Sequence, residues 1–427
     1  MTHKREIFAI AIPAIVSNLT TPVLGLVDVA ITGHIGASIY IGAIAVGGTI
    51  FNMLYWLFNF LRMGSGGLTA QAYGAGDIER SRIILYRALF IGVAVGLAMI
   101  AFSQPLCSLV LGFMDADIAT AELARRYFSI CIWGAPAVMS SYALSGWFVG
   151  MQDSRSAMWM AIMTNIVNIA VSLLLVFVFN LKIEGVATGT MVSQWSGFLL
   201  GMSIVFYRYR VSIPSLSSII DRGELMAFFR INADIFLRTC CLVAVTMWFT
   251  HVGAQSGSDI LAANAILMQL FMLFSYFMDG FAYAGEALAG KYVGAADRAS
   301  LRTLIQSLLK VGGVCAFATS FIYLIFGDAF ICLLTDNQTV VEIACRYSLW
   351  TVLIPLCGFL AFIWDGIFVG LVATRAMLIS MAIAIAVFFT VYFSFVGTLA
   401  NDALWLAFNV YLLIRGLVQA IIHSKYF

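Results

Sequence analysis

The sequence predicts an all-α membrane protein of twelve transmembrane helices, arranged as two pseudo-symmetric six-helix lobes around a central cavity. Three observations lead to this fold class. Hydrophobic residues make up 62% of the 427 residues and charged residues only 10%, and a soluble protein could not hide so much apolar surface from water. Twelve apolar stretches are each long enough to cross a bilayer, which takes about 20 residues. The two halves of the chain also repeat each other at a fixed offset, which relates position 74 to position 294.

The repeat rests on motifs that share this one gapless offset. Gly-Trp-Phe-Val-Gly at 146–150 matches Gly-Ile-Phe-Val-Gly at 366–370, and Gly-Ala-Gly-Asp at 74–77 matches Gly-Ala-Ala-Asp at 294–297. Ala-Arg-Arg-Tyr at 124–127 likewise matches Ala-Cys-Arg-Tyr at 344–347. Chance among common Gly and Ala residues is the alternative, and three motifs on one offset argue against it. Self-similarity of this kind is typical of a transporter built from two related bundles. Two positions related by the offset are called repeat equivalents below.

Each predicted helix is an apolar run between polar segments. In chain order the runs are 7–31, 39–70, 82–112, 120–150, 157–180, 185–207, 226–252, 259–291, 300–327, 340–371, 376–399 and 403–422. The first run follows Lys4 and Arg5 and continues past Asp28 without a small-residue cleavage site, so we interpret it as a spanning helix rather than a signal peptide. Several runs exceed the bilayer requirement, and we expect tilts, bends or extensions into the headgroup layer.

The stretch 208–224 is the only convincing linker, because it alone is rich in charged residues and serine. We therefore predict an N-terminal six-helix lobe at 1–207, a cytoplasmic linker at 208–224 and a C-terminal six-helix lobe at 225–427. An even number of helices in each lobe makes the repeats parallel, related by an axis along the membrane normal. A cavity between the lobes that opens alternately to either side is the simplest mechanism.

The distribution of Lys and Arg predicts the orientation. Thirteen of them lie on the side that holds both termini and the linker. The opposite side has only Arg125, Arg126, Lys182 and Arg346. By the positive-inside rule, both termini are expected in the cytoplasm.

Asp28 is an ionisable residue deep in the first predicted helix. A charged side chain at the bilayer centre costs about 2.5–3.5 kcal/mol on insertion scales, so its presence needs a reason. Burial favours the neutral form of a carboxyl group, which would let the side chain load and release a proton. The alternative is a carboxylate held by hydrogen-bond donors only to join helices.

Uncharged polar residues are candidates to complete a site with Asp28. Asn165, Asn168 and Ser172 share one face of the helix predicted at 157–180, because they are three and four residues apart. Thr190 lies in the next helix. Each residue alone fits an interhelical hydrogen bond, but together with Asp28 they predict an internal proton or cation site.

A second, charged set lies in the C-terminal half. Its members are Arg238, Asn264, Asp279, Glu286 and Asp365. Asp279 and Glu286 are seven residues apart and so lie on one helix face. Two interpretations stay open, namely an ion-pair network that assembles the lobe and a set of acids that binds a cationic substrate.

Four stretches resemble the multidrug and toxic compound extrusion (MATE) transporters. Residues 22–36, with Val-Asp at 27–28 and Gly-His-Ile-Gly at the end, resemble their first helix, and 67–75 resemble the end of their second. Residues 279–287 and 365–370, which begin Asp-Gly-Phe and Asp-Gly-Ile, resemble the damage-inducible-F (DinF) bacterial branch. The resemblance covers all twelve helices. It implies a multidrug efflux antiporter that exports organic compounds against an inward flow of H⁺ or Na⁺.

The resemblance also implies roles for single residues. The family's N-lobe cation site uses an Asp in the first helix, an Asn and an Asp four residues apart in the fifth, and a Thr in the sixth. These positions correspond to Asp28, Asn168, Ser172 and Thr190, so a serine replaces the second acid. One carboxylate makes a tight Na⁺ site harder to build, and we expect H⁺ as the coupling ion, with Na⁺ at Asp28, Asn168 and Thr190 as the alternative.

Together these observations predict a proton-coupled transporter of the bacterial cytoplasmic membrane. We expect a monomer that exports small organic compounds, contacts membrane lipid, and uses no nucleic acid and no cofactor besides the coupling ion. Aromatic residues (14%) and 19 Met suit hydrophobic or cationic cargo, although most such residues pack helices. The alternative is a flippase for a lipid-linked precursor, against which the few deep Lys and Arg argue weakly. Motifs for nucleotide hydrolysis and for intramembrane enzymes are absent from the sequence, so we expect no enzyme.

Overall fold

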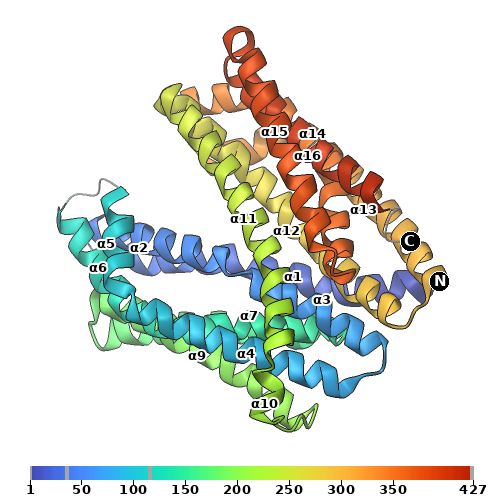
Figure 1. Cartoon of the computed structure of the whole chain (residues 1–427). Helices are drawn as coiled ribbons and strands as arrows, with labels where there is room; N and C mark the ends of the chain where they lie inside the picture. Colours follow the sequence, from blue (N-terminus) through green and yellow to red (C-terminus); the bar gives the residue numbers. More distant parts are fainter. Residues whose placement is uncertain (1, 34–37, 114–117, 424–427) are drawn as a thin grey trace. The chain divides into compact units, whose positions relative to one another are not determined.

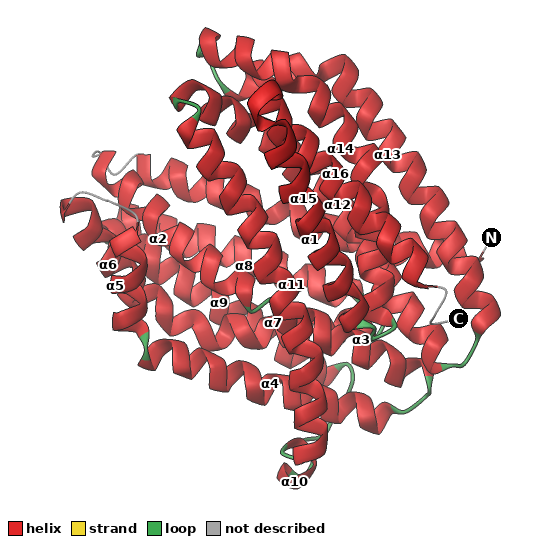
Figure 2. Cartoon of the chain, turned by 45° about the horizontal axis from the view of Figure 1, so that its top comes forward, coloured by secondary structure: helices red, strands yellow, loops and turns green. Residues whose placement is uncertain are grey.

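The computed structural model describes residues 2–33, 38–113 and 118–423, and every regular element within these ranges is helical (Figures 1 and 2). The first-half elements are α1 (Thr2–Gly33), α2 (Ser38–Leu57), α3 (Phe60–Gly74), α4 (Ile78–Ala101), α5 (Ser103–Phe113), α6 (Ile118–Cys131), η1 (Ile132–Gly134), α7 (Ala135–Gly150), α8 (Ser154–Leu173), η2 (Leu174–Val178), α9 (Lys182–Tyr207) and α10 (Leu216–Ile219). The second-half elements are α11 (Arg222–Gln255), α12 (Ser258–Gly294), α13 (Arg298–Leu334), α14 (Gln338–Gly370), α15 (Thr374–Leu399) and α16 (Asn401–Ile422).

All twelve predicted spans fall on helices, and four of them are built from two or three consecutive segments. Ten helical stretches of the described chain are long and apolar enough to cross a membrane. The spans predicted at 7–31 and 185–207 are not among these ten, although α1 and α9 are helices of 32 and 26 residues. Glycine, serine and threonine residues in α9 lower its hydropathy.

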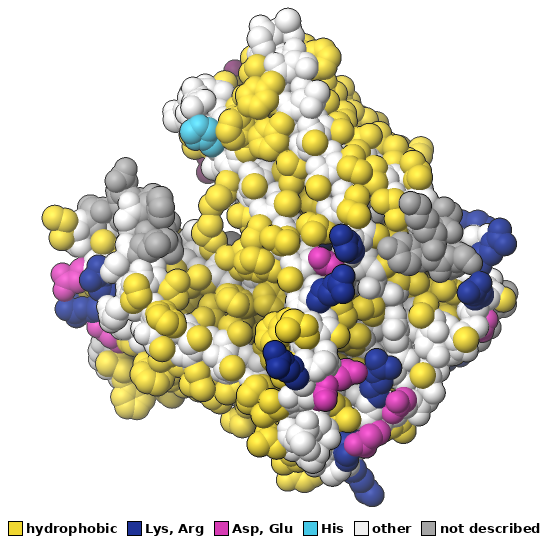
Figure 3. Space-filling view, in the orientation of Figure 1, with side chains coloured by type: hydrophobic (Ala, Val, Ile, Leu, Met, Phe, Trp, Pro, Cys, Tyr) yellow, Lys and Arg dark blue, Asp and Glu magenta, His cyan; other side chains and the backbone are white. Residues whose placement is uncertain are grey.

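The surface of the protein supports a lipid environment. Large hydrophobic side chains are exposed along α13, and Val314, Phe317 and Phe321 are each more than half exposed. On the face drawn in Figure 3, hydrophobic side chains cover most of the surface, and the charged side chains form a few separate groups. Exposed apolar surface of this extent suits lipid tails and would be unfavourable in water.

The helices form two compact units. The first unit is Val16–Phe229, and the second is Met1–Ile15 with Arg230–Phe427. α1 and α11 therefore each contribute to both. The lobe boundaries predicted from the sequence, 1–207, 208–224 and 225–427, stay a prediction.

Equivalent helices pack on each other in both units. In the first unit α3 and α4 pack against α7, and α8 packs along α9. In the second unit α12 and α13 pack against α14, and α15 lies along α16 (Figure 1). Each second-unit pair is the repeat equivalent of a first-unit pair, so the sequence repeat corresponds to a repeat of helix packing.

Helix ends also repeat at the same offset. α3 ends at Gly74 and α12 at its repeat equivalent, Gly294. The turn that follows has a positive φ at Gly76 (72°) and at its repeat equivalent, Ala296 (55°). A non-glycine residue rarely adopts such a φ without cause, so the turn is reproduced even where its glycine is not.

The Gly-x-x-x-Gly motifs of the repeat mark a close helix crossing. A Cβ atom at Gly146 on α7 would overlap the carbonyl oxygen of Arg62 on α3. In the second unit a Cβ atom at Gly366 on α14 would overlap the carbonyl oxygen of Ala282 on α12, and Ala282 is the repeat equivalent of Arg62. Because only glycine lets two backbones approach this closely, the crossing explains why the motif occurs twice.

The first unit is more segmented than the second. Its helices are interrupted between Leu57 and Phe60, at Phe102, by the 3₁₀ turn η1, and by the π-helical stretch η2. The equivalent parts of α12, α13, α14 and α15 are continuous. π-helical stretches are rare and occur frequently at functional sites, so the breaks direct attention to the first unit.

The predicted linker is held on the first unit by a buried arginine. Arg87 of α4 donates hydrogen bonds to the carbonyl oxygens of Ser218 (3.0 Å) and Ile219 (3.2 Å) and to Glu224 (3.1 Å).

A second contact lies at the start of the linker. Tyr209 donates its hydroxyl to the carboxylate of Asp153, which precedes α8, at 2.8 Å. Burial and this hydrogen bond raise the pKa of Tyr209 well above its ordinary value, so the phenol keeps its donor hydrogen over a wider range of pH.

Candidate ion site and charged network

The first candidate site lies where α8 crosses α9 in the first unit. Asn168 of α8 donates its side-chain amide to Oγ1 of Thr190 on α9 at 3.1 Å. Thr190 in turn donates its hydroxyl to the carbonyl oxygen of Val186, one turn earlier on α9, at 3.0 Å. These two hydrogen bonds fix the orientation of the Asn168 amide, so that its oxygen points away from Thr190.

Two oxygens at this crossing are buried without a hydrogen-bond partner among the described residues. They are Oδ1 of Asn168 and Oγ of Ser172, and the two side chains are 1% and 0% exposed. A buried polar atom without a partner costs about 1–3 kcal/mol. A site that retains two such atoms is therefore poised for a donor or a cation.

Glycines of α9 bring the two helices together. Cβ atoms at Gly189 and Gly197 would overlap the hydroxyl oxygens of Ser172 and Thr164 on α8. This places the α9 backbone directly against Ser172. The sequence reasoning missed Gly189, and the signal that could have found it is the glycine spacing along one face of this helix.

The structure does not join all residues of the predicted site. Asp28 lies in α1, but its side chain is outside the described residues. Asn165 is half-buried on α8, one turn from Asn168. Asn168, Ser172 and Thr190 are the members that the structure brings together, and their role in transport stays a prediction.

The second candidate site is a charged network centred on Asp365 of α14. Its carboxylate accepts hydrogen bonds from the guanidinium groups of Arg238 on α11 and Arg415 on α16. Gln419, also on α16, donates to the other oxygen at 2.7 Å. All four side chains are buried. A buried carboxylate with three N–H donors is well compensated in its charged form.

The predicted partners of this network lie at different distances from it. Asp279 of α12 is half-buried and within electrostatic range of Arg415. Glu286 is buried two turns farther along α12, where the backbone crosses α14. Two arginines and two acids, Asp365 and Asp279, leave the centre of the network close to neutral.

Asn264 belongs to a separate cluster. It exchanges side-chain hydrogen bonds with Asn401 at 2.9 and 3.0 Å and accepts another from the indole of Trp405. Asn264 precedes Asp279 on α12 by about four helical turns, which corresponds to about 22 Å along a helix. Asn264 therefore joins the start of α12 to the start of α16 and does not contact the Asp365 network.

Sequence reasoning did not assign Arg415 and Gln419 to the network. The signal was available in their spacing, because residues four apart share a helix face. Sequence spacing alone could not indicate that this face meets Asp365, which is 50 residues from Arg415.

Aromatic residues form a third cluster, between α11 and α15 of the second unit. The Trp248 ring lies 5.3 Å from Phe389, 6.0 Å from Tyr392 and 5.8 Å from Phe393, all edge-on. The indole nitrogen of Trp248 is buried and has no hydrogen-bond partner in the described part of the chain. Rings with an unused donor suit a flat molecule that carries a hydrogen-bond acceptor.

Comparison with known proteins agrees with the repeat. The MatE family model matches residues 13–174 and again residues 234–396. The starts of the two matches, 13 and 234, differ by only one position from the offset seen in the motifs.

Three curated proteins illustrate the sequence similarity. The chain is 35% identical to DNA damage-inducible protein F of Escherichia coli (strain K12), over 100% of this chain and 93% of that protein. It is 25% identical to Protein DETOXIFICATION 44, chloroplastic, of Arabidopsis thaliana, over 86% and 71% of the two chains. It is 22% identical to the multidrug export protein MepA of Staphylococcus aureus (strain MSSA476), over 82% and 78%.

Solved structures show the same fold. A crystal structure of MATE in the bent conformation matches with a TM-score of 0.87 at 18% identity, over 99% of this chain and 96% of that chain. The Vibrio cholerae MATE transporter VcmN in the bent form matches with a TM-score of 0.87 at 17% identity, over 100% and 97%. These matches confirm the predicted fold class of twelve helices in two lobes.

Proposed function

The chain belongs to the MatE family of transporters, and from this membership we propose that it exports small organic compounds in exchange for inward H⁺. As a family member it is a multi-pass membrane transporter and not an enzyme. The coupling to H⁺, the organic cargo and transport by alternating access are proposed beyond family membership. The proposal places the protein in the bacterial cytoplasmic membrane as a monomer, with both termini on the cytoplasmic side because most Lys and Arg lie on that side.

The observation that carries the proposal is the pair of oxygens, at Asn168 and Ser172, that have no hydrogen-bond partner within the described ranges. Both belong to the unit that contains Asp28. A protonated carboxyl group can donate to an amide oxygen, and an ionised one can accept from a serine hydroxyl. Asp28 is the proposed proton carrier, and the crossing of α8 and α9 supplies partners for either protonation state.

The chemistry of these partners favours H⁺ over Na⁺. Asn168, Ser172 and Thr190 are neutral, and Thr190 already uses its hydroxyl hydrogen within α9. A cation in a low-dielectric site needs its charge compensated, and Asp28 is the one acid assigned to this site. A proton carried by that acid requires no further negative charge.

The Asp365 network is proposed to be structural and not an ion site. Arg238 and Arg415 already occupy one oxygen of Asp365, and Gln419 occupies the other. A coupling cation would have to displace a guanidinium group and leave it buried without a partner, which is costly. The arginines thus take the place that an external cation would need.

The aromatic cluster supports hydrophobic or cationic cargo. The edges and faces of Trp248, Phe389 and Phe393 offer stacking and cation–π contacts. Apart from His251, the nearby parts of α11 and α15 (239–255 and 376–399) contain no basic residue, so a cation would not be repelled there. The flippase alternative would favour a strongly basic cavity, and two of the buried arginines are already paired with Asp365.

Uptake into inverted membrane vesicles tests the proposed function. An imposed proton gradient, acidic inside, is expected to drive accumulation of fluorescent organic cations, and an uncoupler is expected to stop it. The same vesicles with a Na⁺ gradient and no pH gradient are the control. Accumulation that follows the Na⁺ gradient alone would contradict H⁺ coupling, and no accumulation of any cation in the panel would contradict the class of cargo.

A further inference from the structure

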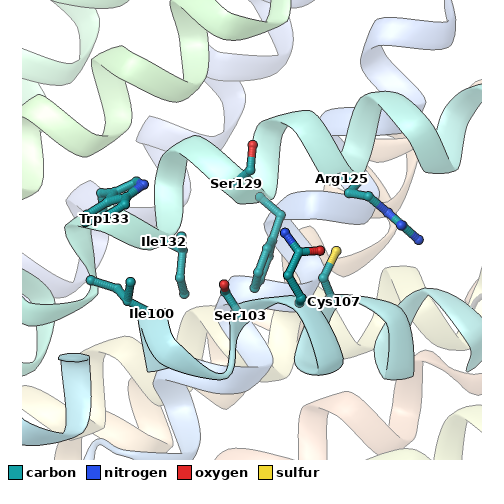
Figure 4. A pocket seen from close by; sticks show the side chains of 9 residues that line it. Ile100, Ser103, Cys107, Arg125, Ser129, Ile132 and Trp133 are labelled. Carbon is teal, nitrogen blue, oxygen red and sulfur yellow. The ribbon is translucent and has the colours of Figure 1, made fainter. Parts of the chain in front are cut away.

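The first unit contains a cavity that the proposed transport cycle does not use. It has a volume of about 280 Å³ and lies between the end of α4, α5, α6 and η1 (Figure 4). Its lining residues are Ile100, Ser103, Gln104, Cys107, Arg125, Phe128, Ser129, Ile132 and Trp133. None of these residues belongs to α8 or α9, where the candidate ion site lies.

The cavity has a polar part and an apolar part. Arg125 extends from α6 toward the helix that carries Cys107 (Figure 4), and Ser103 and Gln104 add polar side chains from α5. Ser129 does not contribute its hydroxyl, which donates to the carbonyl oxygen of Arg126. The opposite wall is apolar and aromatic. A ligand that fits both parts is an amphiphile with an acceptor-rich head.

The fold itself does not require the polar residues. The repeat equivalents of Ser103, Gln104 and Arg125 are Tyr323, Leu324 and Cys345. Tyr323 is buried and donates its hydroxyl to the carbonyl oxygen of Leu270 at 2.7 Å. The same helical arrangement is thus built in the second unit with a large tyrosine and without the positive charge. The small and polar residues of the first unit need another reason.

The break between α4 and α5 is a second difference between the two units at this point. α4 ends at Ala101, and α5 begins at Ser103 after Phe102. The equivalent helix α13 runs without interruption from Arg298 to Leu334. The interruption turns the start of α5 and so positions Ser103 and Gln104 in the cavity lining.

Arg125 and its neighbour Arg126 differ in their pairing within the described residues. Arg126 pairs with Glu122 at 3.3 Å and with Glu184 at 3.7 Å. Arg125 has no acidic partner among the residues that the structure describes. A guanidinium group in a partly apolar cavity is suited to a phosphate, which it can bind with two parallel hydrogen bonds.

The Arg125 end of the cavity lies toward the headgroup level of the membrane. Arg125 is about two helical turns from the start of α6, and Trp133 follows about two turns farther along. Trp133 is 58% exposed and Phe102 is 62% exposed. Trp195, which donates its indole N–H to the carbonyl oxygen of Trp133 at 3.1 Å, lies in the middle of α9 (Lys182–Tyr207), so the Trp133 end of the cavity lies deeper in the membrane. A basic residue near the end of a span suits the headgroup region, and exposed aromatic side chains deeper along the span suit lipid tails. By the orientation proposed above, the Arg125 end faces outward.

We propose that this cavity binds the phosphate of an anionic phospholipid in the outer leaflet. Arg125 and Gln104 hydrogen-bond the phosphate oxygens, and the lipid tails lie along Phe102 and Trp133. Ligand pockets for whole drug-sized molecules have volumes of about 300–1,000 Å³. A cavity at the lower limit of that range fits a headgroup whose tails remain in the bilayer. The site would fasten the segmented outer end of the first unit to the membrane.

Native mass spectrometry of the purified full-length protein tests the proposal. Delipidated protein is titrated with dioleoyl phosphatidylglycerol and, separately, with dioleoyl phosphatidylcholine. Wild type is expected to bind phosphatidylglycerol at least about fivefold more tightly, since an arginine favours net negative charge. Arg125→Gln is expected to weaken phosphatidylglycerol binding about tenfold, whereas the matched control Arg126→Gln changes it less than about twofold.

A second variant tests the cavity independently of its charge. Ser103→Tyr copies the second unit and is expected to fill the space, so that phosphatidylglycerol binding is lost while Arg125 remains. Unchanged melting temperature and gel filtration would show that each variant folds.

Three outcomes would overturn the proposal. Equal losses of phosphatidylglycerol binding in Arg125→Gln and Arg126→Gln would indicate that the lipid binds to the positive surface in general and not to the cavity. Normal binding in Ser103→Tyr would place the lipid elsewhere. Displacement of the lipid by low-millimolar inorganic phosphate would assign the cavity to free phosphate. None of these outcomes depends on the coupling ion or the cargo.

Discussion

The two units share a backbone plan but place different chemistry on it. The crossing of α8 and α9 in the first unit contains neutral polar side chains, Asn168, Ser172 and Thr190. In the second unit, the repeat equivalents of Asp28, Asn168 and Ser172 are aromatic. These residues are Trp248, Phe388 and Tyr392. The rings of Trp248 and Tyr392 lie 6.0 Å apart, so they also meet at an interhelical contact.

Other positions are charged in the second unit and uncharged in the first. The charged residues Arg238, Glu286 and Asp365 of the second unit are matched in the first by residues without charge. These are Asn18, Gly66 and Ser145. Because one fold accommodates both sets, neither is required to form the helices. Positions where the repeats disagree in polarity are therefore the places where the units differ in role, which we propose is transport at Asn168 in the first unit and assembly of the unit at Asp365 in the second. Positions where the repeats agree define the fold that the two units share.

The largest expected effect is in the second unit, at the centre of its charged network. Asp365→Ala leaves Arg238 and Arg415 buried without their common acceptor. Removing one partner of a buried pair costs about 3–5 kcal/mol, and we expect low yield together with loss of transport. The measurements are membrane yield by blotting and melting by fluorescence-detected gel filtration.

A charge-balanced variant sharpens this test. Arg238→Met combined with Asp365→Leu removes one charge of each sign and leaves Arg415 within range of Asp279. Partial recovery of the yield is expected. If Asp365→Ala alone is as stable as wild type and fully active, the network is not structural, and the contrast between the units fails.

The next effect is in the first unit and should concern transport alone. Asp28→Asn keeps the size and hydrogen-bonding capacity of the side chain but cannot release a proton. We expect normal yield and export reduced to background, because the proposed carrier can no longer cycle. Export at the wild-type rate under a proton gradient would remove Asp28 from the mechanism.

A smaller change is expected when the missing acid is restored. Ser172→Asp adds a carboxylate against the α9 backbone at Gly189 and next to Asn168 and Thr190. A second acid can compensate the charge of a bound cation, so Na⁺ is expected to stimulate export by this variant more than by wild type. Transport rates over a series of NaCl concentrations, with choline chloride as the osmotic control, give the comparison. A wild type that already requires Na⁺ would contradict the premise.

How much of this the sequence could predict differs between fold and site. The twelve helices could be predicted because long apolar runs have few alternatives in a membrane. Asn168 and Thr190 could be grouped because helical spacing and adjacency put them on neighbouring helices. The partner of Asn264, residue Asn401, is 137 positions away. That pairing depends on how α12 packs against α16, and spacing along one helix contains no information about it.

The same limit explains the charged network. The sequence offered Arg238 as a partner for several acids, and the structure pairs it with Asp365. The contacts of Arg415 and Gln419 with Asp365 follow only from the packing of α16 against α14, since no short sequence motif links these residues to that carboxylate. Spacing identifies the face of a helix, and three-dimensional packing decides what the face meets.

The smallest expected effect concerns positions where the two units agree. Asp77 and Asp297 are repeat equivalents and cap α4 and α13. Asp77 accepts the backbone N–H of Arg80 at 2.9 Å, and Asp297 that of Ser300 at 3.0 Å. Replacing either aspartate with alanine removes one N-cap, and we expect each to lower the melting temperature by about 1 °C without affecting coupling. Asparagine, which also caps well, should restore both.

The pH dependence of this small effect can be derived from the cap at Asp297. Hydrogen bonds from the Ser300 side chain and backbone lower the pKa of Asp297 from its ordinary value. A carboxylate whose pKa is lowered by folding stabilises the protein above its unfolded pKa, about 3.9, and loses that contribution as the pH falls through the lower folded value. Melting curves of wild type and Asp297→Ala should therefore differ by a constant amount from about pH 6 to 8 and converge only below about pH 4. A large loss of stability at one cap and none at the other would show that the repeats differ in the residues that define their fold as well as in those that we assign to function.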